Sequence, residues 1–431
     1  MRLDRQAGTV GRKRRGVPHM TTQAHDDGDA GTNGTVWHEA YPELGTGPIP
    51  IEPCVSPEYF ALERERIYKQ TWLNVGRIEQ LPRSGDYFVK DLPVCDTSVI
   101  LTRGWDGALH AFHNMCSHRG NKIVWDQKGS CQNFTCRFHG WSYGLNGDLR
   151  FVPDEERFCD LKKDRLGLTP TRVGVWEGFI FINLNPTPTE TLQEHLGELG
   201  AGLEGYPFAQ LTTRYAWHTE LKANWKVLKD AFHEAYHVPF LHKRSLPDSF
   251  TSPDNPYAHA FAFKLYERNH RMSVFGNPGH QPSPVELLAH RFGASIVRRD
   301  WEMADLPPGM NPTRSPFWAF DANMIFPNFD VFVFDGTYLT HHFWPLAPDR
   351  TLWEVKTYFP DARNAAQRFS QEYSKVLLRE ALLEDASTLE ATQSMLASGA
   401  KKEFVLQDQE LLVRHGHKVI EDLVGFYRAR A

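Results

Sequence analysis

Two short segments rich in cysteine and histidine constrain this chain more than any other feature. Cys116 and His118 are separated by one residue, and Cys136 and His139 by two. Two such pairs on two loops can supply four ligands to a tetrahedral zinc ion. They can equally hold a [2Fe–2S] cluster, with both cysteines on one iron and both histidines on the other. Because each loop contributes one Cys and one His, rather than a cysteine pair followed by a histidine pair, the spacing favours the iron–sulfur cluster.

Glycines follow both pairs, which predicts two tight loops around the cluster. Gly120 and Gly140 stand directly behind the paired positions. We expect backbone amides of these loops to point at the cluster sulfurs, where hydrogen bonds help to set the redox potential. The other nearby candidates, Cys131, His110 and His113, lie outside the paired positions and are interpreted as structural.

A second cluster of ionisable residues lies in "DAFHEAYHVPFLH", residues 230 to 242. A helix over residues 224–237 would place Asp230, Glu234 and His237 near one face. Val238-Pro239 would end that helix, because proline disfavours the helical conformation in the residue before it. His242 would then approach from the following turn. Two histidines with one carboxylate form the ligand set of non-haem Fe(II) oxygenases.

The remaining histidine of this segment, His233, competes with the proposed pair because it lies four residues before His237. An additional histidine is more often structural than ligating, so we interpret it as a supporting or surface residue. The third ligand must come from elsewhere. The helix-forming segment "LLEDASTLEATQ" offers carboxylates, but spacing alone does not choose among Glu380, Glu384, Asp385 and Glu390, and a solvated face is the default interpretation.

Composition excludes several classes of protein. The 431 residues are 41% hydrophobic and 23% charged with a net charge of -5, typical of a globular protein without a nucleic-acid-binding field. The absence of a long apolar run or an apolar leader predicts a cytoplasmic protein with no membrane partner. "GAGLEG", residues 200–205, matches a dinucleotide motif, but it follows a helical segment, so we expect a helix end and a turn.

The motifs "NMCSHRG", "CRFHGWSY", "NWK" and "E-x-Y-H-x4-H" together resemble the α (catalytic) subunit of Rieske non-haem iron ring-hydroxylating oxygenases. The resemblance runs from about Trp72 to the C-terminus. It implies that Cys116, His118, Cys136 and His139 hold the Rieske cluster, and that His237, His242 and Asp385 bind a mononuclear Fe(II). Glu234 would be the carboxylate that carries electrons between subunits, from His139 of the partner subunit to His237. Asp230 is left as a supporting residue near the iron.

The expected fold is α+β, an all-β Rieske [2Fe–2S] domain followed by a helix-grip catalytic domain in which helices cover an antiparallel sheet. Short alternating segments with glycines predict the Rieske domain at residues 71–186, and mixed strand and helix patterns predict the catalytic domain at residues 187–431. Residues 1–45, with the basic run 12–15, are expected to be a disordered tail. Residues 46–70 are expected to pack on the catalytic domain.

The resemblance implies a terminal oxygenase that receives electrons from an NAD(P)H reductase, directly or through a ferredoxin, and works as a head-to-tail homotrimer. Aromatic segments such as "FWAFDANMIFPNFDVFVFDG" and "HHFW" are consistent with a large apolar pocket. The expected substrate is therefore hydrophobic, aromatic or polycyclic. The alternative is a monooxygenase or demethylase of a quaternary ammonium or methoxy compound, with cation–π contacts to the ammonium group. A zinc-dependent hydrolase and a purely electron-transferring Rieske protein are the rival classes.

Overall fold

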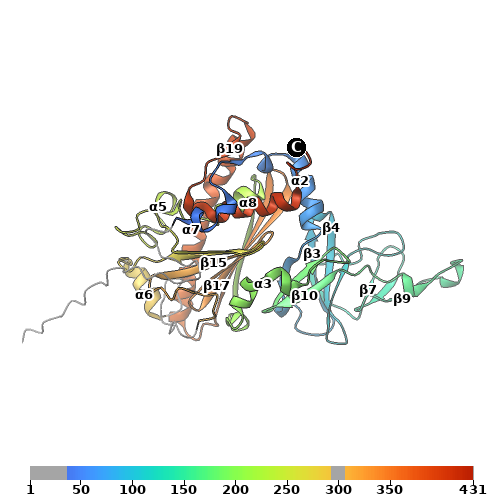
Figure 1. Cartoon of the computed structure of the whole chain (residues 1–431). Helices are drawn as coiled ribbons and strands as arrows, with labels where there is room; N and C mark the ends of the chain where they lie inside the picture. The colour runs from blue at the N-terminus through green and yellow to red at the C-terminus, as the bar shows by residue number, and fades with distance from the viewer. Residues whose placement is uncertain (1–35, 293–305, 431) are drawn as a thin grey trace, which may run out of the picture.

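The computed structural model describes residues 36–292 and 306–430. Figure 1 shows an all-β part at one end of the molecule and a larger part, in which helices cover a sheet, at the other. The basic run 12–15 lies outside the described residues. Within them, no helix is both long enough and apolar enough to span a membrane.

The all-β part consists of three small antiparallel sheets. The sheet orders are β10-β11-β2, β5-β4-β3-β6 and β7-β8-β9. Residues 116–120 and 136–140 form loops around the third sheet. The strands are β2 (Leu73–Arg77), β3 (Asp86–Leu92), β4 (Thr97–Arg103), β5 (Leu109–His113), β6 (Lys128–Ser130), β7 (Asn133–Thr135), β8 (Ser142–Gly144), β9 (Leu149–Phe151), β10 (Arg172–Trp176) and β11 (Phe179–Asn183).

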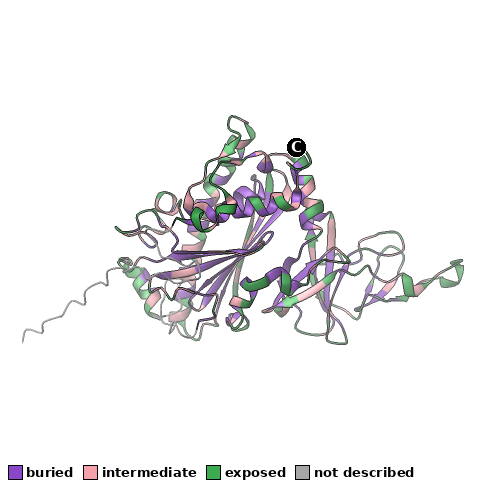
Figure 2. Ribbon diagram, in the orientation of Figure 1, coloured by how far each residue is buried: buried purple, intermediate pink, exposed green. Residues whose placement is uncertain are grey.

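The larger part is built on one seven-stranded antiparallel sheet of order β12-β18-β17-β16-β15-β14-β13. Figure 2 shows that this sheet is largely buried, while the outer sides of the helices are exposed. Its strands are β12 (Thr213–Leu221), β13 (Ala262–Leu265), β14 (His270–Phe275), β15 (Trp318–Ile325), β16 (Phe329–Phe334), β17 (Thr337–Ala347) and β18 (Arg350–Phe359). The helices that follow the all-β part are α3 (Leu192–Leu203), α4 (Trp225–Asp230), α5 (Val238–Leu241), α6 (Pro284–Phe292), α7 (Ala365–Ala397) and α8 (Leu411–Val424).

Alternation along β16 assigns its side chains to two different cores. Phe329, Val331 and Val333 pack with phenylalanines of β11 and leucines of α3, against the all-β part. Phe332 and Phe334 face the opposite core, beneath α4 and α7. Because successive strand residues point to opposite faces, Asp330 shares the second face with these two phenylalanines. This face of the sheet carries the candidate site.

The N-terminal segment is held by residues near the C-terminus. β1 (Ile49–Pro50) pairs with β19 (Glu403–Phe404), and α2 (Pro57–Glu63) packs on α8. The last ten residues of the predicted tail are folded instead: residues 36–45 contain α1 (Trp37–Ala40) and a 3-10 turn, η1 (Pro42–Leu44). The reason is Trp37, which is buried against Phe263 and whose backbone N–H donates to Asp408.

The "GAGLEG" segment forms the last residues of α3 and the turn after it, as expected. The helix predicted over residues 224–237 is wrong in its second half. α4 ends at Asp230, and Val238-Pro239 begins α5 instead of ending a helix. Proline is favoured in the first turn of a helix, where its missing N–H has no partner to lose. Between the two helices, the Glu234 carboxylate accepts the backbone N–H of His237 at 3.1 Å, a local bond that competes with continued helix.

Candidate active site

The two Cys/His loops adopt the same backbone conformation. Gly120 and Gly140 have φ of 75° and 74°, which favours glycine, and each donates its N–H to the carbonyl of Cys116 or Cys136, at 2.9 and 3.0 Å. The two glycine N–H groups therefore do not face the sulfurs. At Cys136, the expected backbone amides are those of Phe138 and His139. Burial opposes ionisation of Cys136, but hydrogen bonds from the Phe138 and His139 backbone and from the Asn121 and Cys116 side chains together outweigh it, so the pKa of this thiol is lowered.

The four predicted cluster ligands lie together at the tips of these loops. Both cysteines are buried, and the Nδ1 atoms of His118 and His139 are 3.1 Å apart at the surface. A partner that the sequence reasoning missed is Tyr143, whose hydroxyl lies 3.2 Å from Cys116 Sγ and accepts the N–H of Ser117. Its only signal in the sequence was the "HGWSY" motif. Two sulfurs and two imidazoles grouped in this way match the donor set of a Rieske cluster.

The three excluded residues have other contacts. His113 Nδ1 is 2.9 Å from Thr97 Oγ1, His110 pairs with Asp106, and Cys131 is half-buried on the edge of the core of the all-β part. This agrees with the structural role assigned to them.

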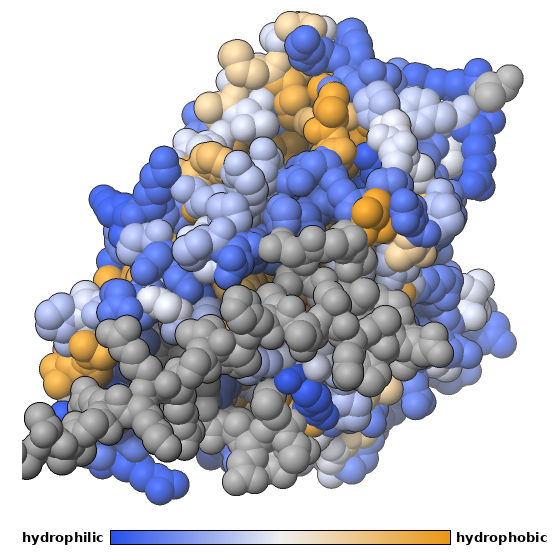
Figure 3. Space-filling view, turned by 60° about the vertical axis from the view of Figure 1, so that its left-hand side comes forward, coloured by the Kyte–Doolittle hydropathy of each residue, from blue (hydrophilic) through white to orange (hydrophobic). Residues whose placement is uncertain are grey.

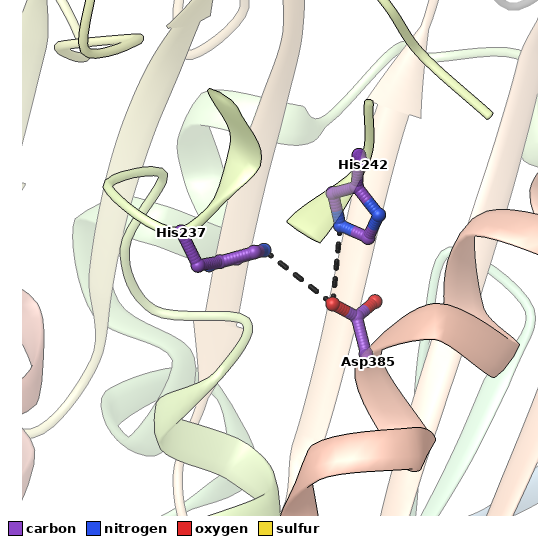
Figure 4. Close-up of side chains that lie close together, drawn as sticks. All are labelled: His237, His242 and Asp385. Atoms are coloured by element: carbon purple, nitrogen blue, oxygen red, sulfur yellow. Dashed lines mark ion pairs between the residues drawn. The ribbon is translucent and has the colours of Figure 1, made fainter. Parts of the chain in front are cut away.

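The second centre brings together His237, His242 and Asp385. The Nε2 atoms of the two histidines lie 3.4 and 3.1 Å from the same oxygen, Asp385 Oδ1. Figure 4 shows both rings pointing at the carboxylate, the histidines from either end of α5 and the aspartate from α7. Among the described residues this is the only group of three potential ligands whose donor atoms lie within 4.8 Å of one another. Two nitrogens and one oxygen fit the facial arrangement of non-haem Fe(II).

An outer carboxylate holds each histidine from behind. His237 Nδ1 is 2.5 Å from Glu234 Oε1, and His242 Nδ1 is 2.9 Å from Glu384 Oε2. Burial lowers the histidine pKa values, but the hydrogen bonds that His237 donates to Glu234 and His242 donates to Asp385 outweigh burial and raise both pKa values. A bound cation would take the place of these protons at Nε2. Carboxylates at Nδ1 are the usual means of fixing the ring and tautomer of a metal-ligating histidine.

The four carboxylates of the acidic helix therefore separate by position. Asp385 faces both histidines, and Glu384 supports one of them. Glu380 pairs with Arg244, and Glu390 accepts the backbone N–H of Lys222, both away from the centre. Spacing could not distinguish these residues, because the choice depends on which face of α7 meets α5.

His233 and Asp230 make their hydrogen bonds with residues outside this centre. His233 is fully buried, which corrects the surface alternative, and its Nε2 lies 3.2 Å from Asp330 Oδ2. Asp230 accepts a hydrogen bond from His417 Nε2 at 2.7 Å. This bond joins the end of α4 to α8, and the supporting role of Asp230 near the iron stays a prediction.

A small apolar cavity of about 110 Å³ adjoins the three residues. Phenylalanines from the predicted aromatic segment line it, together with Phe232 and aliphatic residues of α7; these are Phe320, Phe332 and Phe334, with Leu377, Leu378 and Leu382. The "HHFW" segment lies behind this lining, where the His341 ring packs on Phe232 in a tilted arrangement. Glu234, His237, His242 and Asp385 are the only ionisable groups among the described lining residues.

The surface turned forward in Figure 3 is mainly hydrophilic, with hydrophobic side chains gathered in limited groups.

The fold and both centres define a Rieske-type protein with a second metal site. Comparison with known families agrees: residues 71–170 match the Rieske [2Fe-2S] domain, and residues 208–425 match the ring hydroxylating alpha subunit (catalytic domain). The chain belongs to this ring-hydroxylating α-subunit family. The predicted fold class and the Rieske cluster with a mononuclear iron as the family's cofactors are thereby confirmed.

Relatives of known name are oxygenase subunits. The carnitine monooxygenase oxygenase subunit of Escherichia coli K12 is 32% identical over 44% of this chain and 50% of its own length. Choline monooxygenase of Atriplex hortensis is 33% identical over 43% of each chain. The glycine betaine monooxygenase oxygenase subunit of Chromohalobacter salexigens is 29% identical over 56% of this chain and 53% of its own. The chain thus spans about half the length of the curated relatives it matches.

Solved structures share the fold over nearly the whole chain. A quaternary ammonium Rieske monooxygenase superposes with a TM-score of 0.71 at 18% identity, covering 89% of this chain and 96% of the other. Naphthalene 1,2-dioxygenase of Rhodococcus sp. gives 0.68 at 20% identity, covering 90% and 96%.

Proposed function

We propose that this chain is the terminal oxygenase component of a Rieske-type oxygenase, with a mononuclear Fe(II) held by His237, His242 and Asp385. The observation that carries the proposal is that both Nε2 atoms face one buried aspartate oxygen. A bound iron would supply O2 activation there, using electrons that arrive through the [2Fe–2S] cluster. The zinc-hydrolase alternative would use the same ligands but gives no role to the Rieske domain.

The protein's own residues prepare this centre. Glu234 and Glu384 hold the two rings so that each presents a lone pair on Nε2. The phenylalanine walls exclude water from the space next to the ligands, which strengthens polar interactions in the site and limits side reactions. The substrate would be held by shape in this cavity, since few polar groups are available to orient it.

Electron delivery is proposed to cross between subunits. Figure 1 shows β7, beside the cluster loops, and α5, beside the proposed iron site, at opposite ends of the folded molecule. We infer a head-to-tail homo-oligomer, a trimer as expected from the resemblance, in which Glu234 joins His237 to His139 of the partner subunit. Exposed aromatic side chains at both ends support such an interface: Phe138 beside the cluster and Tyr236 and Phe240 beside Glu234. An NAD(P)H reductase, directly or through a ferredoxin, would reduce the cluster.

The substrate class is proposed from the relatives and the cavity together. The named relatives are monooxygenases of carnitine, choline and glycine betaine, so we favour the alternative of a quaternary ammonium compound over a polycyclic one. An aromatic wall can hold such a cation through its ring faces. Since no Lys or Arg is among the described lining residues, a carboxylate on the substrate would lack a partner. We therefore propose a choline-like cation without a carboxylate.

A second candidate is a single-ring aromatic substrate. A cavity of about 110 Å³ lined by phenylalanine and leucine suits a compact apolar ring; an engineered cavity of about 150 Å³ binds benzene. A polycyclic hydrocarbon exceeds this volume.

The test uses purified protein with both metals, NADH and a surrogate reductase. The reduced protein should show the electron paramagnetic resonance signal of a Rieske cluster. With choline, O2 consumption and an oxidised product are expected, while L-carnitine and glycine betaine should react at least about tenfold more slowly, because each buries an unpaired carboxylate. Toluene tests the second candidate. Absence of the Rieske signal, or of any O2-dependent product across this panel, would contradict the proposal.

A further inference from the structure

Three buried histidines form a hydrogen-bonded row through the larger part of the molecule. We call His233, His270 and His415 the histidine row. His270 Nε2 lies 3.0 Å from His233 Nδ1, and its Nδ1 lies 2.8 Å from Nδ1 of His415. Beyond His233, the row ends on the carboxylate of Asp330, at 3.2 Å. All four side chains are less than a tenth exposed. The residues come from four elements far apart in sequence: α8, β14, the segment after α4, and β16.

The two ends of the row reach different places. His415 lines a crevice of about 270 Å³ together with exposed charged residues, among them Glu267 and Lys418. Asp330 lies two positions before Phe332 on β16, on the face of the sheet that carries the apolar cavity of the proposed iron site. The row therefore runs from a crevice at the surface to Asp330, which lies on the cavity side of the sheet without lining the cavity itself.

All hydrogen bonds in this row must have the same donor-to-acceptor direction while the three histidines are neutral. A neutral imidazole has one N–H and one acceptor nitrogen. If Asp330 is ionised, His233 Nε2–H donates to it, His270 Nε2–H donates to His233, and His415 Nδ1–H donates to His270. If Asp330 is protonated, every bond reverses. The His415 ring can then donate through its other nitrogen to the Tyr266 backbone, to which it is hydrogen-bonded. The arrangement with protonated Asp330 holds one proton more than the other.

We propose that the histidine row is a proton relay that reprotonates Asp330 from the surface crevice. One proton accepted by His415 shifts one proton along each bond, and Asp330 gains a proton while no charge remains on the histidines. The relay rests on the proposed function, because oxygenation with two electrons and O2 also consumes two protons from solvent, forming one hydroxylated product and one water.

The surroundings favour proton passage over a charged histidine. Burial lowers the pKa of His233 and of His270 well below its usual value, so both rings stay neutral. Burial raises the pKa of Asp330 well above its usual value, although the Lys229 ammonium opposes this. The other charged or titratable groups that face the row are Asp230, His417 and Lys418. Protonation is thus favoured at Asp330, the inner end.

His341 lies beside the inner end of the row, on the next strand of the sheet. It is paired with Asp330 in the register of β16 and β17, and its ring packs on Phe232 and Phe332, both of which line the cavity. Trp353 donates its Nε1–H to His341 Nδ1 at 3.0 Å, so the proton of the neutral ring is on Nε2. That Nε2 atom is buried and has no hydrogen-bond partner among the described residues. A buried donor of this kind calls for a water or a reacting group.

The test follows the Asp330 carboxyl group by infrared spectroscopy in the metal-loaded protein, without any substrate. The carboxylic acid band of Asp330 is identified as the band that Asp330→Asn removes. After a switch into D2O, this band should shift rapidly in the wild type. In His270→Gln, whose amide can form hydrogen bonds but cannot carry a proton from one atom to the other, the shift should be about 100-fold slower. His415→Gln, at the surface end, is a second variant with the same expected result.

His195→Gln is the matched control. His195 is a buried histidine outside the row, and both ring nitrogens have partners, Glu190 Oε1 and the Phe326 carbonyl. Its substitution should leave the Asp330 exchange rate unchanged. Equal exchange in the wild type, His270→Gln and His415→Gln overturns the relay, and so does the finding that Asp330→Asn removes no carboxylic acid band. Because exchange needs no turnover, failure of the relay is distinguishable from failure of the proposed oxygenase activity.

Discussion

His242 Nδ1 lies 2.9 Å from Glu384 Oε2, so the residue next to the proposed aspartate ligand holds the ring of a proposed histidine ligand. Ser245 Oγ donates to the same carboxylate oxygen at 2.5 Å. Adjacent residues on α7 thus act on opposite sides of one imidazole. We predict that Glu384→Gln lowers Fe(II) affinity about 10- to 100-fold, the usual effect of removing a carboxylate behind a histidine ligand. Iron titration of the metal-depleted protein measures this, with Ser245→Ala expected to have a smaller effect. Unchanged affinity in Glu384→Gln would contradict the supporting role.

Asp385→Asn should abolish binding of the mononuclear iron while leaving the Rieske cluster intact. The reason is that Asp385 is the one carboxylate, within the part of the chain that the structure describes, that faces both histidine Nε2 atoms. The measurement is iron and acid-labile sulfide per chain, together with the Rieske electron paramagnetic resonance signal. Glu390→Gln, on the same helix but bonded to the Lys222 backbone, is the control and should retain full iron content. The reverse pattern would move the ligand to Glu390.

Glu234→Gln is expected to keep both metals and lose most turnover, because an amide cannot serve as the acceptor from imidazole N–H groups on both sides. Metal content and steady-state O2 consumption measure the two effects. Mixed oligomers provide the sharper test: His139→Ala chains combined with Asp385→Asn chains should regain activity if electrons cross between subunits. Wild-type turnover in Glu234→Gln would remove the bridging role.

The ion pair between Glu63 and Lys226 ties the N-terminal segment to the start of α4. Glu63 Oε1 lies 2.6 Å from Lys226 Nζ, both side chains are fully buried, and Glu63 also accepts from Trp225 Nε1. Glu63→Ala leaves a buried ammonium unpaired and should lower the free energy of unfolding by about 3–5 kcal/mol. The control is Glu65→Ala, which breaks the exposed pair with Lys69 and should cost less than about 1 kcal/mol. Denaturant titration distinguishes the two.

His280 is predicted to make stability depend on pH. Burial lowers its pKa, but hydrogen bonds to Glu286 and Asp248 outweigh this and raise the pKa above 6.5. A raised histidine pKa contributes stability that is fully present below 6.5 and is lost as the pH rises through the raised value. His280→Gln should therefore lower the melting temperature at about pH 6 and much less at about pH 9. His290→Gln is the control: burial lowers the pKa of His290, so its effect should not follow this trend.

The sequence by itself determined which residues are candidates for the two centres. Cys116, His118, Cys136 and His139 could be identified from spacing, because two short loops must return to one cluster. Spacing left His233 in competition with His237 and His242, and the family resemblance made the choice between them. The elements β16, β17 and α7 follow from their hydrophobic periods. These features depend on residues that are near one another along the chain.

Tertiary structure decided what long-range packing controls. Asp385 and Glu384 take different roles only because α7 presents one to both histidines and the other to the back of His242. Their neighbours in sequence, including Glu380, could not be separated by spacing. The end of α4 at Asp230, the buried position of His233 and the row it forms with His270 and His415 depend on β14, β16 and α8 meeting beneath the cavity. A linear pattern carries no information about how these three elements and the segment after α4, all distant in sequence, come together.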